Sequence, residues 1–157
     1  MEFASTAAAT ADDSYHLTSS LAGRVEVSKA ANFMRAYLWV SLGAIVGANL
    51  RYFVSRLAAK LISPNFPYGT LIINVSGSFI LGLFLIWTTE RVFADPKWRW
   101  LVAIGFCGSY TTFSGFAYET MAYFEQGHWS LFALNIVSNN VLCLAAVIAG
   151  AAVARAI

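Results

Sequence analysis

Four apolar stretches separated by short polar segments define the hydrophobic pattern of the chain. A helix needs about 20 apolar residues to cross the hydrocarbon core of a bilayer, and each stretch reaches that length. We therefore predict an all-α membrane protein with four transmembrane helices. The predicted spans are residues 37–59, 68–89, 100–119 and 129–154.

The third predicted span is unsuited to a continuous apolar helix at its centre. Residues 105–116 read GFCGSYTTFSGF, in which glycine and hydroxyl residues are interspersed with aromatic ones. Non-helical backbone at membrane depth is tolerated only where it is buried in protein or lines a watery cavity. We therefore predict a broken third helix whose carbonyl and hydroxyl groups face an ion or a pore.

The composition also favours a membrane protein. Of the 157 residues, 59% are hydrophobic and 11% are charged, with a mean hydropathy of +0.63, whereas a soluble domain has about 25% charged residues. The formal net charge of +2 is too small to indicate nucleic acid, so we expect membrane lipid and no nucleic acid as surroundings. Cys107 and Cys143 lie in apolar runs and are expected to be reduced. His16 and His128 lie too far apart in the sequence to suggest a transition-metal site.

The N-terminal segment differs from the rest of the chain. Residues 1–32 are rich in Ala, Ser and Thr and carry scattered charges of both signs. We interpret them as a polar, flexible extension, because chain ends without an apolar face are often loosely held. Residues 33–157 are then the four-helix transmembrane domain.

Polar side chains recur at helical spacing within two of the predicted spans. Thr70 and Asn74 lie four residues apart in the second span, and therefore share one face. Asn135, Asn139 and Cys143 repeat every four residues in the last span and form a similar stripe. Either set could be a seam of hydrogen bonds between helices, or a track of polar groups along the wall of a pore.

Two charged residues lie near the ends of predicted spans. Arg51 lies a few residues before the end of the first span, where it either extends to the interface or lines a vestibule that attracts anions. Glu119 closes the third span and is the acidic residue that borders a span. It is either an interfacial acid that pairs with a neighbour or a titratable group of a transport site.

Three motifs together resemble the signatures of the CrcB/Fluc fluoride channels. They are GAIVGANLRY at 43–52, GTLIINVSGSFILG at 69–82 and GFCGSYTTFSGF at 105–116, in the same order and with similar spacing. The resemblance covers about residues 37–155. It implies a multi-pass channel of the plasma (inner) membrane that lowers cytoplasmic fluoride by passive electrodiffusion. It also implies an antiparallel, dual-topology homodimer with two narrow fluoride paths at the interface.

The resemblance assigns most residues of the fluoride path. Thr70 and Asn74 match its polar residues on the second helix, and Phe113 and Phe116 match the phenylalanines whose ring edges face fluoride. Fluoride holds its water strongly, so a path needs close, uncharged donors that replace hydration and still release the ion. The Asn74 amide, the hydroxyls of Thr70 and Ser114, and the positive ring edges are donors of this kind.

The resemblance also implies a structural sodium ion as cofactor. Gly108 and Thr111 match the positions whose backbone carbonyls hold that ion at the centre of the dimer. A cation held there would satisfy carbonyls released by the helix break and add a favourable field for an anion.

The chain departs from the family pattern at several places. Many members have Tyr, Ser and Ser where this chain has Asn135, Asn139 and Cys143, and usually Thr at Gly115. The three departures in the last span leave the details of the fourth-helix wall open. The loops are a further departure. With the N-terminus inside, seven basic residues lie on the inner side and two or three on the outer side, whereas dual insertion requires near balance. An oppositely inserted paralogue is therefore an alternative to the homodimer.

Two other functions remain open at this stage. A proton-coupled small four-helix exporter would use Glu119 as its titratable carboxylate. A non-transporting membrane scaffold would explain the glycine-rich faces but leaves Asn74 and the paired phenylalanines without a role. We do not expect an enzyme, because the spans contain no nucleophile paired with a base and no carboxylate or histidine cluster.

Overall fold

The computed structural model describes residues 2–62, 65–90 and 95–157, with side chains described at residue 24 and from residue 26 onward. These residues form helices and contain no strand, which confirms the predicted all-α class. The helices are α1 (Glu2–Leu61), α2 (Tyr68–Glu90), α3 (Pro96–Trp98), the π-helix η1 (Arg99–Cys107), α4 (Gly108–Tyr110), α5 (Phe113–Glu125) and α6 (Trp129–Ala156).

The chain divides into two compact units, Met1–Ala36 and Tyr37–Ile157. In the first unit the backbone is helical from Glu2 onward. Alanine has the highest helix propensity of the amino acids, and the segment before residue 12 is rich in it. Lys29 and Glu26 add an exposed ion pair at 2.8 Å. The flexibility expected for residues 1–32 stays a prediction.

Three helices among the described residues are long and apolar enough to cross a membrane. They are Glu26–Leu61, Tyr68–Glu90 and Trp129–Ala156. They contain the first, second and fourth of the predicted spans. The third predicted span is composed of shorter helices that follow one another, namely η1, α4 and the first part of α5.

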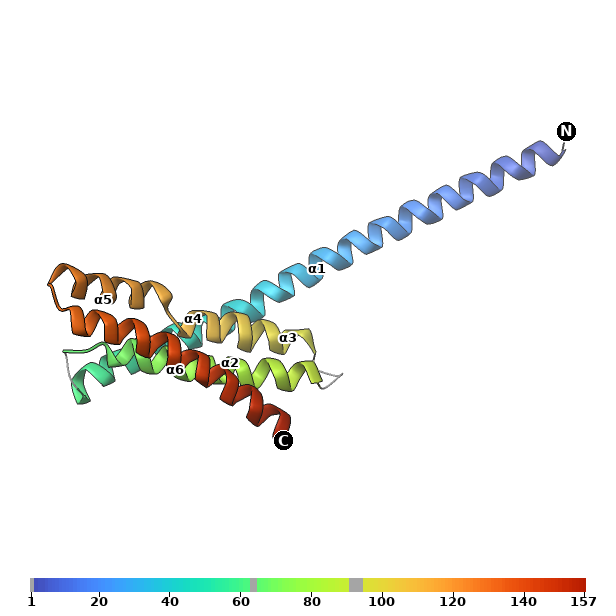
Figure 1. The fold of residues 1–157 in the computed structure, drawn as a ribbon. Helices are drawn as coiled ribbons and strands as arrows, with labels where there is room; N and C mark the ends of the chain where they lie inside the picture. The colour runs from blue at the N-terminus through green and yellow to red at the C-terminus, as the bar shows by residue number, and fades with distance from the viewer. Residues whose placement is uncertain (1, 63–64, 91–94) are drawn as a thin grey trace. The chain divides into compact units, whose positions relative to one another are not determined.

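Helices α2 and α6 lie side by side in the second unit (Figure 1). Their close approach depends on glycine. A Cβ added to Gly82 would collide with the Val147 carbonyl of α6, and one added to Gly150 would collide with the Phe79 carbonyl of α2. Small residues at such crossings let two helix backbones approach closely inside a membrane. The resulting contact fixes α2 against α6, and both helices contribute to the site described below.

Asp95 forms the start of the helical run that leads into the third predicted span. Its side chain accepts the backbone N–H of Lys97 at 3.0 Å and pairs with Lys97 Nζ at 2.9 Å. Pro96 follows as the first helical residue, a position that tolerates proline because no helical N–H is needed there. The bond from the Lys97 N–H and then the nearby ammonium lower the pKa of Asp95.

Many large apolar side chains are exposed, and the interior contains polar groups. Large apolar side chains such as Ile45 on α1 and Leu144 on α6 are more than half exposed. The buried polar residues in the part of the chain with described side chains are Thr70, Thr120, Asn135 and Asn139. This arrangement suits a protein surrounded by lipid, where buried polar groups need partners within the protein.

Candidate ion pathway

The helical run from η1 to α5 is interrupted at two threonines. Helix α4 ends at Tyr110, and Thr111 and Thr112 have extended backbone, with φ −77°, ψ 158° and φ −147°, ψ 112°. Helix α5 then begins at Phe113, capped by the Thr112 hydroxyl, which accepts the N–H of Gly115 at 3.0 Å. The interruption therefore lies within residues 105–116, the glycine-rich and hydroxyl-rich segment.

Asn74 of α2 fills the interruption with its side-chain amide. Its Oδ1 accepts the backbone N–H of Thr112 at 2.8 Å, and its Nδ2 donates to the Thr112 carbonyl at 3.1 Å. One amide thus satisfies both backbone polar groups of a residue that the helix leaves unpaired. Asn74, which lies deep in an apolar span, thus has hydrogen-bond partners in the backbone of Thr112.

The carbonyls of Gly108 and Thr111 are among those that lose their helical partners as a result. In a continuous α-helix the Gly108 carbonyl would accept from the N–H of Thr112, and the Thr111 carbonyl from that of Gly115. Those N–H groups donate instead to Asn74 Oδ1 and Thr112 Oγ1. The carbonyls of Gly108 and Thr111 are therefore released from helical pairing, and they are the pair expected to hold a sodium ion.

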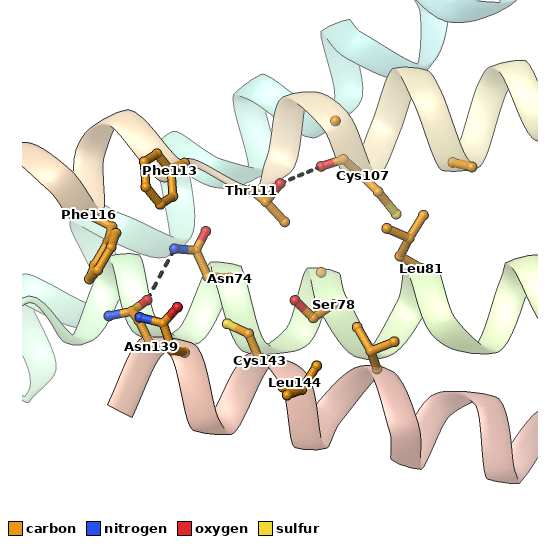
Figure 2. Close-up of a pocket in the computed structure, with 15 residues that line it drawn as sticks. Asn74, Ser78, Leu81, Cys107, Thr111, Phe113, Phe116, Asn139, Cys143 and Leu144 are labelled. Atoms are coloured by element: carbon orange, nitrogen blue, oxygen red, sulfur yellow. Dashed lines mark hydrogen bonds between the residues drawn. The ribbon is translucent and has the colours of Figure 1, made fainter. Parts of the chain in front are cut away.

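A cavity of about 540 Å³ lies beside the interruption (Figure 2). Figure 2 shows Asn74 of α2, Thr111 and Phe113 from around the interruption, and Asn139 and Cys143 of α6 around the same space. None of the described residues that line this cavity carries a charge. The predicted site residues that line it are Asn74, Gly108, Thr111, Phe113, Phe116, Asn139 and Cys143.

Phe113 and Phe116 form a tilted aromatic pair at one end of this cavity. Their ring centroids lie 5.5 Å apart with an interplanar angle of 58°. Phe116 is 8% exposed and packs into the protein, whereas Phe113 is 77% exposed. Within a single subunit, therefore, the Phe116 ring lies in the protein interior and the Phe113 ring lies at the surface, although both residues belong to the first turn of α5.

A chain of hydrogen bonds extends from Asn74 into the protein. Asn74 Nδ2 donates to Asn139 Oδ1 at 3.2 Å, and Asn139 Nδ2 donates to Asn135 Oδ1 at 2.9 Å. Asn135 Nδ2 then donates to the Thr120 hydroxyl at 2.9 Å. Asn135 is fully buried, so the stripe expected on α6 divides: Asn139 and Cys143 line the cavity, and Asn135 lies beneath it.

Thr70 and Glu119 belong to a second cavity, of about 700 Å³. The Thr70 hydroxyl donates to Glu119 Oε1 at 2.6 Å, while Glu119 Oε2 is buried and has no hydrogen-bond partner among the described residues. Thr70 and Asn74 thus lie on one helix face but open onto different cavities. Tyr118, Tyr123 and His128 also line this second cavity.

The remaining predicted residues lie outside both cavities. Arg51 is partly exposed on α1, and Ser114 is exposed at the start of α5, where its hydroxyl shares a hydrogen bond with Thr112 at 3.2 Å. The sequence pattern did not single out Thr120, which joins the buried asparagines to α5. Its position four residues after Phe116, on the same face of a helix, was the available signal.

These features define an all-α membrane protein with an uncharged polar cavity at an interruption between two helices. Residues 38–151 match the family described as CrcB-like protein, Camphor Resistance (CrcB). The chain belongs to this family, as its three motifs suggested.

Several relatives carry the name Fluoride-specific ion channel FluC. The relative from Koribacter versatilis is 65% identical over 124 residues, which cover 79% of this chain and 98% of the relative. The relative from Sulfurihydrogenibium sp. is 45% identical over 122 residues, with 78% and 98% covered. The relative from Paramagnetospirillum magneticum is 42% identical over 116 residues, with 73% and 91% covered.

Proposed function

We propose that the chain is a fluoride-selective ion channel that lowers cytoplasmic fluoride by passive electrodiffusion across the plasma (inner) membrane. The observation that carries this proposal is the 65% identity to a protein named as a fluoride-specific ion channel, over 98% of that relative. Fluoride efflux from liposomes that contain the purified protein tests it.

The uncharged cavity suits an anion that has to bind and leave. A Lys or Arg at a narrow site would hold fluoride too tightly for conduction, and none of the described residues lining the cavity carries such a charge. The weak donors are the edges of the Phe113 and Phe116 rings and the Asn74 amide. Asn74 uses both N–H groups within the protein, on the Thr112 carbonyl and on Asn139 Oδ1, so fluoride at this site would compete with one of these two acceptors.

The proposed assembly is an antiparallel, dual-topology homodimer of four-span subunits. In this arrangement η1, α4 and α5 form a broken third membrane helix between the spans α2 and α6. The exposed Phe113 ring, 77% accessible beside a polar cavity, supports a partner subunit that completes the path. The excess of basic residues on one side keeps an oppositely inserted paralogue as the alternative partner.

A structural sodium ion at the centre of that dimer is part of the proposal. The carbonyls of Gly108 and Thr111 fit such an ion, because the N–H groups that would pair with them are bound to Asn74 and Thr112. Backbone carbonyl oxygen is a ligand that hard cations accept. When bound, the ion supplies a positive field that favours an anion in the neighbouring path.

A proton-coupled exporter is the second candidate function. The observation that favours it is the buried Glu119 Oε2, which lacks a hydrogen-bond partner among the described residues. A carboxyl group in such surroundings could gain and lose a proton during transport. The Thr70 hydroxyl donates to Glu119 Oε1 at 2.6 Å, and the strength of this hydrogen bond would then depend on the charge of the carboxylate.

A further inference from the structure

We propose that Thr120 is a positioning residue of the fluoride path, acting on Asn74 through the buried amides of Asn135 and Asn139. The inference rests on the proposed channel function and extends it to residues that do not touch the path. Thr120 and Asn135 lie outside the lining of the cavity, and both are buried.

The hydrogen bonds that link Thr112 to Thr120 through the three asparagines all have the same donor-to-acceptor direction. At one end, the backbone N–H of Thr112 can only donate, and it donates to Asn74 Oδ1 at 2.8 Å. At the other end, the backbone carbonyl of Phe116 can only accept, and it accepts the Thr120 hydroxyl at 2.7 Å. Because both ends are backbone groups of fixed polarity, every link between them has its donor and acceptor determined.

The orientation of each amide follows from that polarity. Asn74 must turn its oxygen toward Thr112, so its Nδ2 faces Asn139 and finds the oxygen of Asn139 there. Asn139 in turn donates to Asn135 Oδ1, which leaves the Nδ2 of Asn135 for the Thr120 hydroxyl. The hydroxyl can accept from Asn135 because its own hydrogen goes to the Phe116 carbonyl.

The two backbone groups at the ends of this hydrogen-bonded series lie at the start of α5. Thr112 caps that helix and Phe116 lies on its first turn, while Asn74 comes from α2 and Asn139 and Asn135 come from α6. The hydrogen bonds therefore tie the beginning of α5 to both neighbouring helices. The aromatic pair that borders the cavity, Phe113 and Phe116, lies on the helix turn between these two ends.

Removal of the Thr120 hydroxyl would leave Asn135 Nδ2 without an acceptor. An unpaired buried donor is costly in a low-dielectric interior, so the Asn135 side chain would move toward another acceptor. That movement would weaken the bond from Asn139 Nδ2 to Asn135 Oδ1 and displace the Asn139 amide. Asn139 Oδ1 accepts from Asn74 Nδ2, so the displacement would reach the Asn74 amide at the cavity.

The test compares two variants of Thr120 with a matched control. Thr120→Val keeps the shape and removes the hydroxyl, and Thr120→Ser keeps the hydroxyl. Thr88→Val is the control, because the Thr88 hydroxyl also donates to the carbonyl four residues earlier, at 2.8 Å, and no asparagine donates to it in the described structure. We expect Thr120→Val to slow fluoride efflux about tenfold, the effect of losing one buried hydrogen bond. Thr120→Ser and Thr88→Val should conduct at the wild-type rate.

A second readout separates positioning from simple loss of stability. Asn135→Leu added to Thr120→Val removes the amide that has lost its acceptor. The midpoint of thermal unfolding should therefore be higher than in Thr120→Val alone, while efflux stays slow. Wild-type efflux in Thr120→Val, slow efflux in Thr120→Ser, or recovery of efflux in the double variant would overturn the inference.

Hydrogen exchange keeps the inference distinct from the channel function itself. If the wild type conducts no fluoride, the proposed function fails, and exchange of the backbone amides of residues 112–116 in purified protein decides the positioning role. Faster exchange in Thr120→Val with wild-type exchange in Thr120→Ser supports the role. Equal exchange in all three proteins contradicts it.

Discussion

The side-chain amide of Asn74 pairs with both backbone polar groups of Thr112, accepting its N–H at 2.8 Å and donating to its carbonyl at 3.1 Å. A polar residue on α2 therefore takes the place of helical hydrogen bonds at the interruption between α4 and α5. The same amide reaches Asn139 on α6 at 3.2 Å. Asn74 thus joins three segments of the protein at the cavity proposed to conduct fluoride.

The first prediction concerns the replacement of Asn74 by an apolar residue of similar size. Asn74→Leu leaves the N–H and carbonyl of Thr112 unpaired, so we expect fluoride efflux to fall by more than about tenfold and stability by about 2 kcal/mol. Efflux assays and thermal unfolding measure the two effects. Asn49→Leu is the control, because the Asn49 amide donates to the Ile45 carbonyl of its own helix at 2.7 Å and lies outside the described cavities. Normal efflux in Asn74→Leu would remove Asn74 from the path.

The second prediction separates the chemistry of the aromatic pair from its packing. Phe113→Ile removes a ring that is 77% exposed, so the fold of the single chain should lose little stability. Phe116 is 8% exposed, and Phe116→Ile should cost about 1 kcal/mol through altered packing. Both variants lose the positive ring edge and should slow efflux more than they lower the unfolding midpoint. Unchanged efflux in both variants would rule out the ring edges as fluoride contacts.

The third prediction tests the close contact between α2 and the interruption. A Cβ added to Gly77 would collide with the methyl group of Thr111 and lie 3.1 Å from the Tyr110 ring. Gly77→Ala should therefore displace Thr111 and lower stability by about 1–3 kcal/mol. Thr111→Ser removes that methyl group and keeps the hydroxyl that bonds to the Cys107 carbonyl at 3.0 Å. The double variant should recover stability in thermal unfolding. Failure to recover would mean that the contact between residue 77 and the Thr111 methyl group is not the cause of the loss.

The fourth prediction decides between channel and proton-coupled exporter. Glu119→Gln keeps an oxygen that can accept from the Thr70 hydroxyl, as Glu119 Oε1 does at 2.6 Å, but cannot be protonated and deprotonated. For a channel, an imposed proton gradient should drive no fluoride flux beyond what the voltage explains, in either the wild type or the variant. A pH-driven flux in the wild type that disappears in Glu119→Gln would establish the exporter instead.

The fifth prediction concerns the proposed sodium ion. If the carbonyls of Gly108 and Thr111 hold sodium, protein prepared without it should conduct less fluoride and unfold at a lower temperature, since a ligand stabilises the state that binds it. Purification in N-methyl-D-glucamine salts, followed by return of sodium, should show a reversible loss and recovery of efflux. Equal efflux and unfolding midpoints with and without sodium would contradict the site.

The sequence predicted a change of backbone within residues 105–116, because glycine and hydroxyl residues at the centre of an apolar stretch are poorly suited to a continuous membrane helix, and Thr111 and Thr112 in that segment have extended backbone. The sequence could not show which residues of the stripe Asn135, Asn139 and Cys143 line the cavity and which lie beneath it. Each step of four residues turns about 40° around a helix, so the first residue and the last face different neighbours. Asn135 lies buried beneath the cavity, and Cys143 lines it.

The sequence also could not identify partners that come from other helices. Thr70 and Asn74 share a face, but they lie about 6 Å apart along the helix axis, far enough to open onto separate cavities. Thr120 bonds to Asn135 across the contact between α5 and α6. Such a pairing depends on how helices pack, and helical spacing within one segment contains no information about it.

Fluoride efflux from liposomes containing the purified protein, with a potassium ionophore to clamp the voltage and a fluoride-selective electrode as detector, tests the central claim most directly. Chloride release from the same liposomes is the control for selectivity. The proposed channel predicts rapid fluoride release with no chloride release. Absence of fluoride release, both alone and after addition of an oppositely inserted paralogue, would contradict the channel and leave the proton-coupled exporter and the membrane scaffold as the remaining functions.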